Sequence, residues 1–225
     1  MNKNYRIICA EEPKSLIAEA YRKLALNLKY VMLDKNCKVI ALTSARESEG
    51  KTSCTMNLAV TLASLKQKVC VVDLDVRMPK QHIGFELDIK TGITDYILED
   101  KKITDIIKHS KYGVDVLTRG EKVEYSSLVI ESYKTDEIIE ALRAEYDYVL
   151  LDCPPVLLLS DTLSISRFTD GFIFVIDYKN SKRSDVKLAL KELKQVNANI
   201  IGTVATKVTS PRNKNYYYYG GKDGK

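Results

Sequence analysis

The sequence lacks several features that would assign a protein quickly to a class. Its five cysteines lie far apart, with neither a C-x-x-C pair nor paired histidines, so the spacing indicates no zinc site and no disulfide framework. No segment approaches about 18 consecutive apolar residues, and the N-terminus lacks the apolar stretch of a signal peptide. We therefore expect reduced, mostly buried thiols in a cytoplasmic protein that does not insert directly into a membrane.

A strong net charge is missing as well. The 35 basic and 30 acidic residues leave a net charge of +5, which is too mild to indicate a nucleic-acid partner. Part of this excess is local, because the last residues combine basic side chains with four consecutive tyrosines, Tyr216, Tyr217, Tyr218 and Tyr219. The composition of 209–225 predicts a flexible tail that follows a single domain spanning 1–208.

What the sequence does contain is an alternation of short apolar runs with longer helical patterns. Strands are expected at 39–43, 69–74, 114–117, 148–151, 171–177 and 200–204. Helices are expected at 51–66, 134–145, 161–168 and 184–196, and another precedes the first strand at 17–31. Several strands are apolar throughout, as in strands covered on both faces. The pattern predicts an α/β fold with a mainly parallel central sheet and helices on both faces.

The strongest motif runs from Ala45 to Thr52 and has the spacing of a Walker A phosphate-binding loop, with alanine in place of the first glycine. An apolar strand leads in and a helix begins at Lys51, so loop amides would face a triphosphate. Lys51 would reach the β and γ oxygens, and Thr52 would bind Mg²⁺. The predicted nucleotide-binding residues are Ala45, Arg46, Glu47, Ser48, Glu49, Gly50, Lys51, Thr52 and Ser53. A polar turn without a ligand is the alternative.

Two further apolar strands end in carboxylates. Asp73 and Asp75 close the second strand, and side-chain alternation along an extended chain places them on the same side. Ligands bind at the carboxyl ends of parallel strands, and two close carboxylates repel unless a cation or a shared proton intervenes. Asp152 follows the strand at 148–151 in the Walker B pattern and would hold Mg²⁺ directly or through water. A solvated strand end, with Arg77 pairing with Asp75, is the simpler alternative.

Together these motifs resemble the bacterial tyrosine kinases (BY-kinases), which autophosphorylate and regulate capsular or extracellular polysaccharide synthesis. The resemblance covers nearly the whole chain and is to the stand-alone cytoplasmic form. It rests on the phosphate loop, the Asp-x-Asp-x-Arg-x-Pro segment at 73–79, the segments at 92–98 and 154–156, and the terminal tyrosines. It implies a P-loop NTPase fold and a protein-tyrosine kinase that uses ATP and Mg²⁺.

The resemblance also assigns roles to particular residues. It implies catalysis by Lys51, Asp73, Asp75 and Asp152, with Asp75 as base or metal ligand and Asp73 as a supporting acid. Thr52, Asp75 and Asp152 would be the metal ligands. The acceptors would be Tyr216, Tyr217, Tyr218 and Tyr219. Without the kinase motifs, the tail would be interpreted as a disordered aromatic segment that stacks on another protein or on single-stranded nucleic acid.

Partners follow from the same resemblance. Family members form rings through a Glu-x-x-Arg-x-x-Arg motif on the first helix. Here Glu19 and Arg22 match, but Ala25 stands where the second arginine belongs, which weakens the prediction of a ring. A solvated ion pair explains Glu19 and Arg22 equally well. The other implied partners are a phosphotyrosine phosphatase and a transmembrane activator, whose cytoplasmic segment would recruit the chain to the inner face of the membrane.

Two other functions stay open at this stage. A spatial-positioning ATPase of the cell-division or plasmid-partition class shares the fold, but such enzymes carry a lysine where Arg46 stands. A nucleotide-sensing partner of a polysaccharide-export complex would bind ATP without chemistry. That interpretation draws on Glu47 and Ser48, which replace the family's Pro-Gly, since serine adopts positive φ poorly. Thr206 replaces an asparagine that contacts the base in the family, so the sequence supports phosphate binding more strongly than adenine specificity.

Overall fold

A parallel sheet forms the centre of the molecule. The computed structural model describes residues 5–32, 37–99 and 101–208. Within these ranges the sheet has seven strands in the order β3-β4-β2-β5-β1-β6-β7. Their bounds are β1 (Val39–Ser44), β2 (Val69–Asp73), β3 (Ile107–His109), β4 (Asp115–Leu117), β5 (Tyr148–Asp152), β6 (Gly171–Asp177) and β7 (Ile200–Thr206). Neighbouring strands are parallel except β3 and β4, which run antiparallel.

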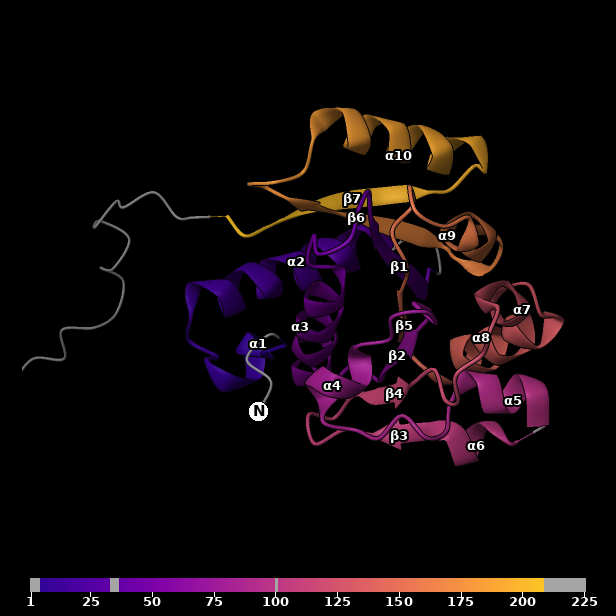
Figure 1. Ribbon diagram of the computed structural model, residues 1–225. Coiled ribbons are helices and arrows are strands. Elements are labelled where there is room, and N and C mark those ends of the chain that lie inside the picture. Colours follow the sequence, from indigo (N-terminus) through magenta and orange to yellow (C-terminus); the bar gives the residue numbers. More distant parts are fainter. Residues whose placement is uncertain (1–4, 33–36, 100, 209–225) are drawn as a thin grey trace, which may run out of the picture.

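Helices cover both faces of this sheet (Figure 1). They are α1 (Ile8–Glu11), α2 (Leu16–Met32), α3 (Lys51–Ser64), α4 (Gln81–Phe85), α5 (Ile93–Glu99), α6 (Ile103–Ile106), α7 (Ser126–Ile130), α8 (Tyr133–Glu145), α9 (Asp161–Ile165) and α10 (Arg183–Gln195), with a 3₁₀ turn at Ser166–Phe168. Helices α2, α3 and α4 contribute to one buried cluster, and α7, α8, α9 and α10 contribute to the other. The fold is therefore a three-layer α/β/α sandwich.

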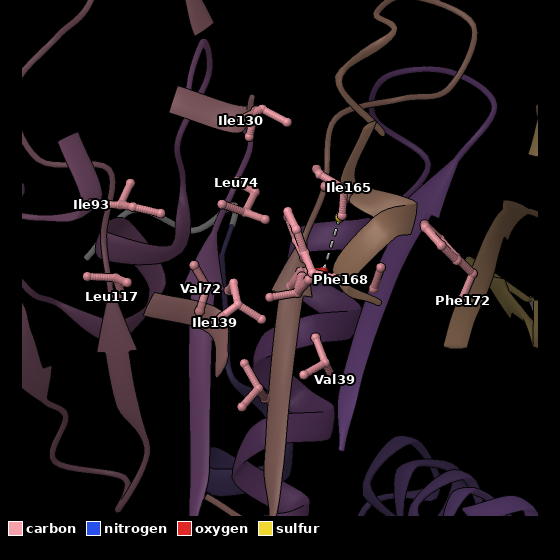
Figure 2. Packing of buried hydrophobic residues seen from close by; sticks show 14 of the residues in the cluster. Val39, Val72, Leu74, Ile93, Leu117, Ile130, Ile139, Ile165, Phe168 and Phe172 are labelled. Carbon is pink, nitrogen blue, oxygen red and sulfur yellow. Dashed lines mark hydrogen bonds between the residues drawn. The ribbon is translucent and has the colours of Figure 1, made fainter. Parts of the chain in front are cut away.

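The central strands divide their side chains between the two clusters. In β1, Val39 and Ala41 belong to one cluster, whereas Ile40 and Leu42 belong to the other, and all four are fully buried. Figure 2 shows part of the first cluster, which contains Val39 and Val72 of the strands together with Ile139 of α8. Burial on both faces explains why these strands are apolar throughout instead of alternating with polar residues.

The structure confirms the predicted α/β fold and adds elements that were not predicted. All six expected strands are present within one or two residues, but the short edge strand β3 and the short helices α1, α4, α5, α6 and α7 were missed. The helix expected at 161–168 is a single α-helical turn followed by a 3₁₀ turn. Cysteine burial agrees with expectation, since Cys37, Cys54, Cys70 and Cys153 are buried and Cys9 is intermediate. The predicted tail at 209–225 lies outside the described residues.

Sheet register brings the sequence motifs together. Asp73 at the end of β2 pairs in register with Asp152 at the end of β5, and Asp152 is also the neighbour of Leu42 in β1. The loop that follows β1 therefore leaves the sheet beside the strand that ends in Asp152, and the strand that ends in Asp73 is the next one along. This arrangement follows from the parallel strand order, because the carboxyl ends of β1, β2 and β5 meet at one edge.

Candidate active site

The phosphate-loop candidate connects β1 to the first turn of α3. Gly50 precedes the helix with φ 98°, a left-handed conformation that glycine adopts without a Cβ penalty. A Cβ at this position would also lie 3.1 Å from side-chain atoms of Thr206. Ser48 adopts positive φ as well, at 61°. The loop thus takes the sharp turn that the Pro-Gly of other loops would favour, although it contains only one glycine.

Hydrogen bonds from the end of β7, from Lys207 just after it and from the loop that follows β6 hold this loop in place. The Thr206 hydroxyl donates to the Glu49 carbonyl oxygen at 2.6 Å, and the Lys207 Nζ donates to the Ser48 carbonyl oxygen at 2.7 Å. The Glu49 carboxylate is 6% exposed and accepts from the Arg46 backbone N–H and from the Ser181 hydroxyl. The buried Glu49 side chain therefore stabilises the loop, and the Thr206 side chain is hydrogen-bonded to the loop backbone.

Arg46 pairs with a carboxylate outside the second and third motifs. Its Nε lies 2.5 Å from Asp185 of α10, and this ion pair raises the pKa of the guanidinium. The side chain is more than half exposed, so the pair is screened by solvent. The contact joins the loop to a helix of the same chain.

Because Arg46 is held by Asp185, we expect Arg46→Ala to change the ATP concentration for half-maximal activity by less than about fivefold. Steady-state kinetics would measure this, with Asp185→Ala as the matched variant that breaks the same contact. A loss of a hundredfold or more in Arg46→Ala alone would show instead that the guanidinium acts on the phosphates.

An open cleft of about 690 Å³ lies beside the loop. Its walls include Ser48, Lys51, Thr52, Asp75, Arg77 and Lys80. The Lys51 side chain is 6% exposed, and its ammonium group lowers the pKa of both Asp75 and Asp152, which places its charge between the two motifs. The cleft thus joins the predicted phosphate lysine to Asp75, as a nucleotide site requires.

Asp73 and Asp152 lie side by side in the interior. Burial raises the pKa of Asp73 well above its usual value of 3.8, and the neighbouring Asp152 raises it further. Burial also raises the pKa of Asp152 to about 6, against the lowering effect of Lys51. One oxygen of each carboxylate, Oδ1, has no hydrogen-bond partner among the described residues. Two such oxygens at the ends of adjacent strands are the kind of site that a cation stabilises.

Asp75 occupies a different position from Asp73. It lines the cleft, and its Oδ1 accepts a hydrogen bond from the Met78 backbone N–H at 3.2 Å. Partial burial raises its pKa, and Lys51 opposes that shift. Of the two carboxylates in the second motif, Asp75 is therefore the one that reaches the cleft, whereas Asp73 is fully buried behind it.

Arg77 contacts neither Asp73 nor Asp75 by a hydrogen bond or ion pair within the described part of the chain. Its Nε donates to the Ser126 hydroxyl at 2.9 Å, and Ser126 in turn donates to Asp161 at 2.8 Å. Arg77 is exposed at the cleft wall. Ser126 and Asp161 thus orient a cationic side chain at the cleft, and neither residue stood out in the sequence.

The cleft offers few protein ligands for a metal. Among the described residues no group of three or more His, Cys, Asp or Glu side chains could enclose an ion. Mg²⁺ keeps several waters and uses one or two carboxylates together with substrate phosphates. The unpartnered Oδ1 of Asp152, with Thr52 near enough to lower the pKa of the same carboxylate, supplies a suitable donor set.

The predicted interface residues Glu19 and Arg22 pair with each other. The Arg22 guanidinium lies 2.7 Å from Glu19, one turn away on α2, and its NH1 also donates to the Pro13 carbonyl oxygen. Ala25 is 2% exposed and packs into the core against α3. The third position of the motif, Ala25, therefore faces the protein interior. A role for Glu19 and Arg22 in a ring stays a prediction.

Burial of Asp73 beside Asp152 should lower the stability of the protein without ligand. Asp73→Asn is expected to raise the free energy of unfolding without ligand by about 1–3 kcal/mol at pH 8, because it removes a buried charge beside another. A raised carboxyl pKa means that the folded state binds the proton more tightly than the unfolded chain, so the advantage should shrink between pH 8 and pH 5. Urea unfolding at both pH values measures it. The exposed Asp105→Asn is the control, and equal shifts in both variants would contradict the prediction.

A lysine at the start of α3, carboxylates at the ends of adjacent parallel strands, and an open cleft beside the loop together define a P-loop NTPase. A family profile describing an AAA domain matches residues 37–204. The tyrosine-protein kinase YwqD of Bacillus subtilis is 30% identical over 218 residues, which cover 96% of this chain and 92% of that protein. The chain belongs to the bacterial tyrosine kinases, so the family and the protein-tyrosine kinase class predicted from the motifs are confirmed.

Structural similarity favours the bacterial tyrosine kinases over the spatial-positioning ATPases. The kinase domain of the Escherichia coli tyrosine kinase ETK has a TM-score of 0.85 at 26% identity, covering 93% of this chain and 84% of that one. The septum site-determining protein MinD of Pyrococcus horikoshii, complexed with Mg-ADP, has a TM-score of 0.64 at 27% identity, covering 75% of this chain and 69% of that one. The fold is common to both, but the kinase domain matches more of the chain more closely.

Proposed function

We propose that this protein is an ATP- and Mg²⁺-dependent autokinase that phosphorylates Tyr216, Tyr217, Tyr218 and Tyr219 and thereby regulates capsular or extracellular polysaccharide synthesis. One observation supports this above the others: Lys51 and Asp75 line the same cleft, and the charges of both shift the pKa of the buried Asp152. The acceptor tyrosines lie outside the described residues, so their role rests on the sequence motif and on membership of the family.

The residues of the cleft suit phosphoryl transfer to a hydroxyl group. Lys51 would hold the β and γ oxygens of ATP, and the loop amides would bind the remaining phosphate oxygens. Thr52 and Asp152 would hold Mg²⁺, with Asp75 near enough to join them, and the bound ion neutralises phosphate charge. The proposed nucleotide-binding set from Ala45 to Ser53 acts mainly through its backbone, because the Arg46 and Glu49 side chains are engaged within the protein.

Asp75 is the proposed base. The tyrosine oxygen attacks the γ phosphorus, the bond from that phosphorus to the bridging oxygen of ADP breaks, and the hydroxyl proton passes to a carboxylate. The partial burial that raises the pKa of Asp75 strengthens it as a proton acceptor. Asp73 is closed to the cleft, so its proposed part is to support this arrangement from behind.

The proposed partners follow from the family. They are a transmembrane activator with a cytoplasmic activating segment, a phosphotyrosine phosphatase, and further copies of the chain in a ring through Glu19 and Arg22. Within the described residues the longest apolar helices are too short or too polar to cross a bilayer. We also propose, from the family, that the chain is cytoplasmic and that the activator recruits it to the inner face of the membrane.

Incubation with ATP and Mg²⁺, with and without a candidate activating segment, tests the proposal when read by a phosphotyrosine antibody and by phosphate release. A kinase produces phosphotyrosine. An ATPase of the partition class releases phosphate in response to DNA or lipid and forms no phosphotyrosine. A nucleotide-sensing partner binds ATP and gives neither product, even with a competent activator.

A further inference from the structure

Gln81 is a fully buried glutamine that contacts both interior carboxylates. Its side-chain Nε2 donates to Oδ2 of Asp152 at 2.8 Å, and its backbone N–H donates to Oδ2 of Asp73 at 2.9 Å. The Lys80 backbone N–H donates to the same Asp73 oxygen at 2.8 Å. Gln81 is 0% exposed, so the burial of this polar side chain has to be explained by these contacts.

The contacts leave a regular pattern of satisfied and unsatisfied oxygens. In each carboxylate Oδ2 is hydrogen-bonded, whereas Oδ1 has no partner among the described residues. The Gln81 Oε1 also lacks a partner there. A donor on one oxygen fixes the rotation of a carboxylate and leaves the other oxygen for a further ligand, which is how the surrounding shell orients groups at metal sites.

Gln81 also closes a loop in the chain. Asp73 ends β2 and Gln81 begins α4, and the hydrogen bond between them joins the two ends of the intervening segment 74–80. That segment carries Asp75 and Arg77, which both line the cleft. One residue therefore ties together the two carboxylate-tipped strands and the loop that carries the proposed base.

We propose that Gln81 is a positioning residue for the magnesium–nucleotide site, acting by holding Asp152 so that its second oxygen stays available to the metal or to a water bound to it. The proposal rests on the proposed function, because it takes Asp152 as part of the Mg²⁺ site. A neutral amide is suited to this role because it satisfies one oxygen without the positive charge that would compete with the cation for the carboxylate.

The proposal is tested by binding of the fluorescent analogue mant-ADP to the full chain in EDTA and over a Mg²⁺ titration. Gln81→Met keeps the length of the side chain but removes the donor. We expect the Mg²⁺ concentration for half-maximal response to rise by about 10- to 100-fold, while affinity in EDTA changes by less than about twofold. The control is Gln195→Met, which changes an exposed glutamine at the end of α10 and should leave both values unaltered.

A second variant tests the same role in case Gln81→Met does not fold. Gln81→Asn keeps an amide one methylene shorter, and we expect a shift in the same direction. Urea unfolding of each variant reports folding separately from binding. Unchanged Mg²⁺ dependence in folded variants, or equal losses in EDTA and in Mg²⁺, would overturn the positioning role. Failure of the wild-type chain to bind mant-ADP at all would instead sink the proposed nucleotide site.

Discussion

Phosphotyrosine formation is expected to fall by at least about 1,000-fold when Lys51 is replaced by methionine. Lys51 is 6% exposed and its charge acts on both Asp75 and Asp152, and a charge with so little solvent around it interacts with phosphate oxygens under weak screening. Methionine is close to lysine in length but carries no charge, so the loss reports the charge and not the shape. The measurement is a phosphotyrosine immunoblot after incubation with ATP, Mg²⁺ and an activating segment.

Lys191→Met provides the matched control. Lys191 lies on the exposed surface of α10, so the same chemical change there should leave phosphorylation within about twofold of wild type. Urea unfolding of both variants shows whether either is destabilised. Activity in Lys51→Met above about one tenth of wild type would contradict the assignment of this lysine to the phosphates.

Replacing the four terminal tyrosines by phenylalanine should reduce autophosphorylation to less than about one tenth, because phenylalanine lacks the hydroxyl that attacks the γ phosphorus. Nucleotide binding should be unaffected, since the described cleft contains none of these residues. Mass spectrometry of the phosphorylated sites, alongside mant-ADP binding, measures both effects. The positions changed are Tyr216, Tyr217, Tyr218 and Tyr219.

The chain contains a matched control with the same number of changes. Tyr30, Tyr125, Tyr133 and Tyr178 are each between 59% and 67% exposed. Their joint replacement by phenylalanine removes four accessible hydroxyl groups outside the tail and should leave autophosphorylation within about twofold. Phosphotyrosine that survives the tail change but is lost in this control would move the acceptor site to the folded domain.

Mixing these variants separates transfer within a chain from transfer between chains. Lys51→Met retains the tail but should not transfer phosphate, whereas the tail variant retains the cleft. From Val208 to Tyr216 an extended chain spans at most about 26–29 Å, so reach alone permits both routes. Phosphate on the Lys51→Met chain in the mixture indicates transfer between chains, and no phosphate there indicates transfer within a chain.

The central strands were predictable because their burial on both faces leaves a continuous apolar run in the sequence. Val39 to Leu42 and Val149 to Leu151 carry that signal, and the structure buries all of these residues. The edge strand β3 carries no such signal, since Ile107 is followed by Lys108 and the exposed His109. Its pairing with β4 depends on a contact between chain segments that local pattern does not encode.

The candidate site was predictable where a charged residue follows an apolar strand at a fixed spacing. Lys51, Asp75 and Asp152 were found in this way: Lys51 and Asp75 line the cleft, and the charges of both act on the buried Asp152. Gln81 was missed because a single glutamine at the start of a five-residue helix has no distinguishing pattern. Its importance appears only when β2 and β5 lie side by side and bring Asp73 and Asp152 to its two donors.

The sequence by itself determined the α/β class, the phosphate loop, the carboxylates and the kinase family, because each depends on residue order along one or two neighbouring elements. The tertiary structure decided which oxygen atoms are free, that Asp75 and not Asp73 reaches the cleft, and that Arg46 pairs with Asp185. It also decided that Arg77 is held by Ser126. These outcomes depend on burial and on contacts between distant segments. In the interior, low dielectric and close packing determine which hydrogen-bond and ion-pair partners form, whereas the sequence alone permits several.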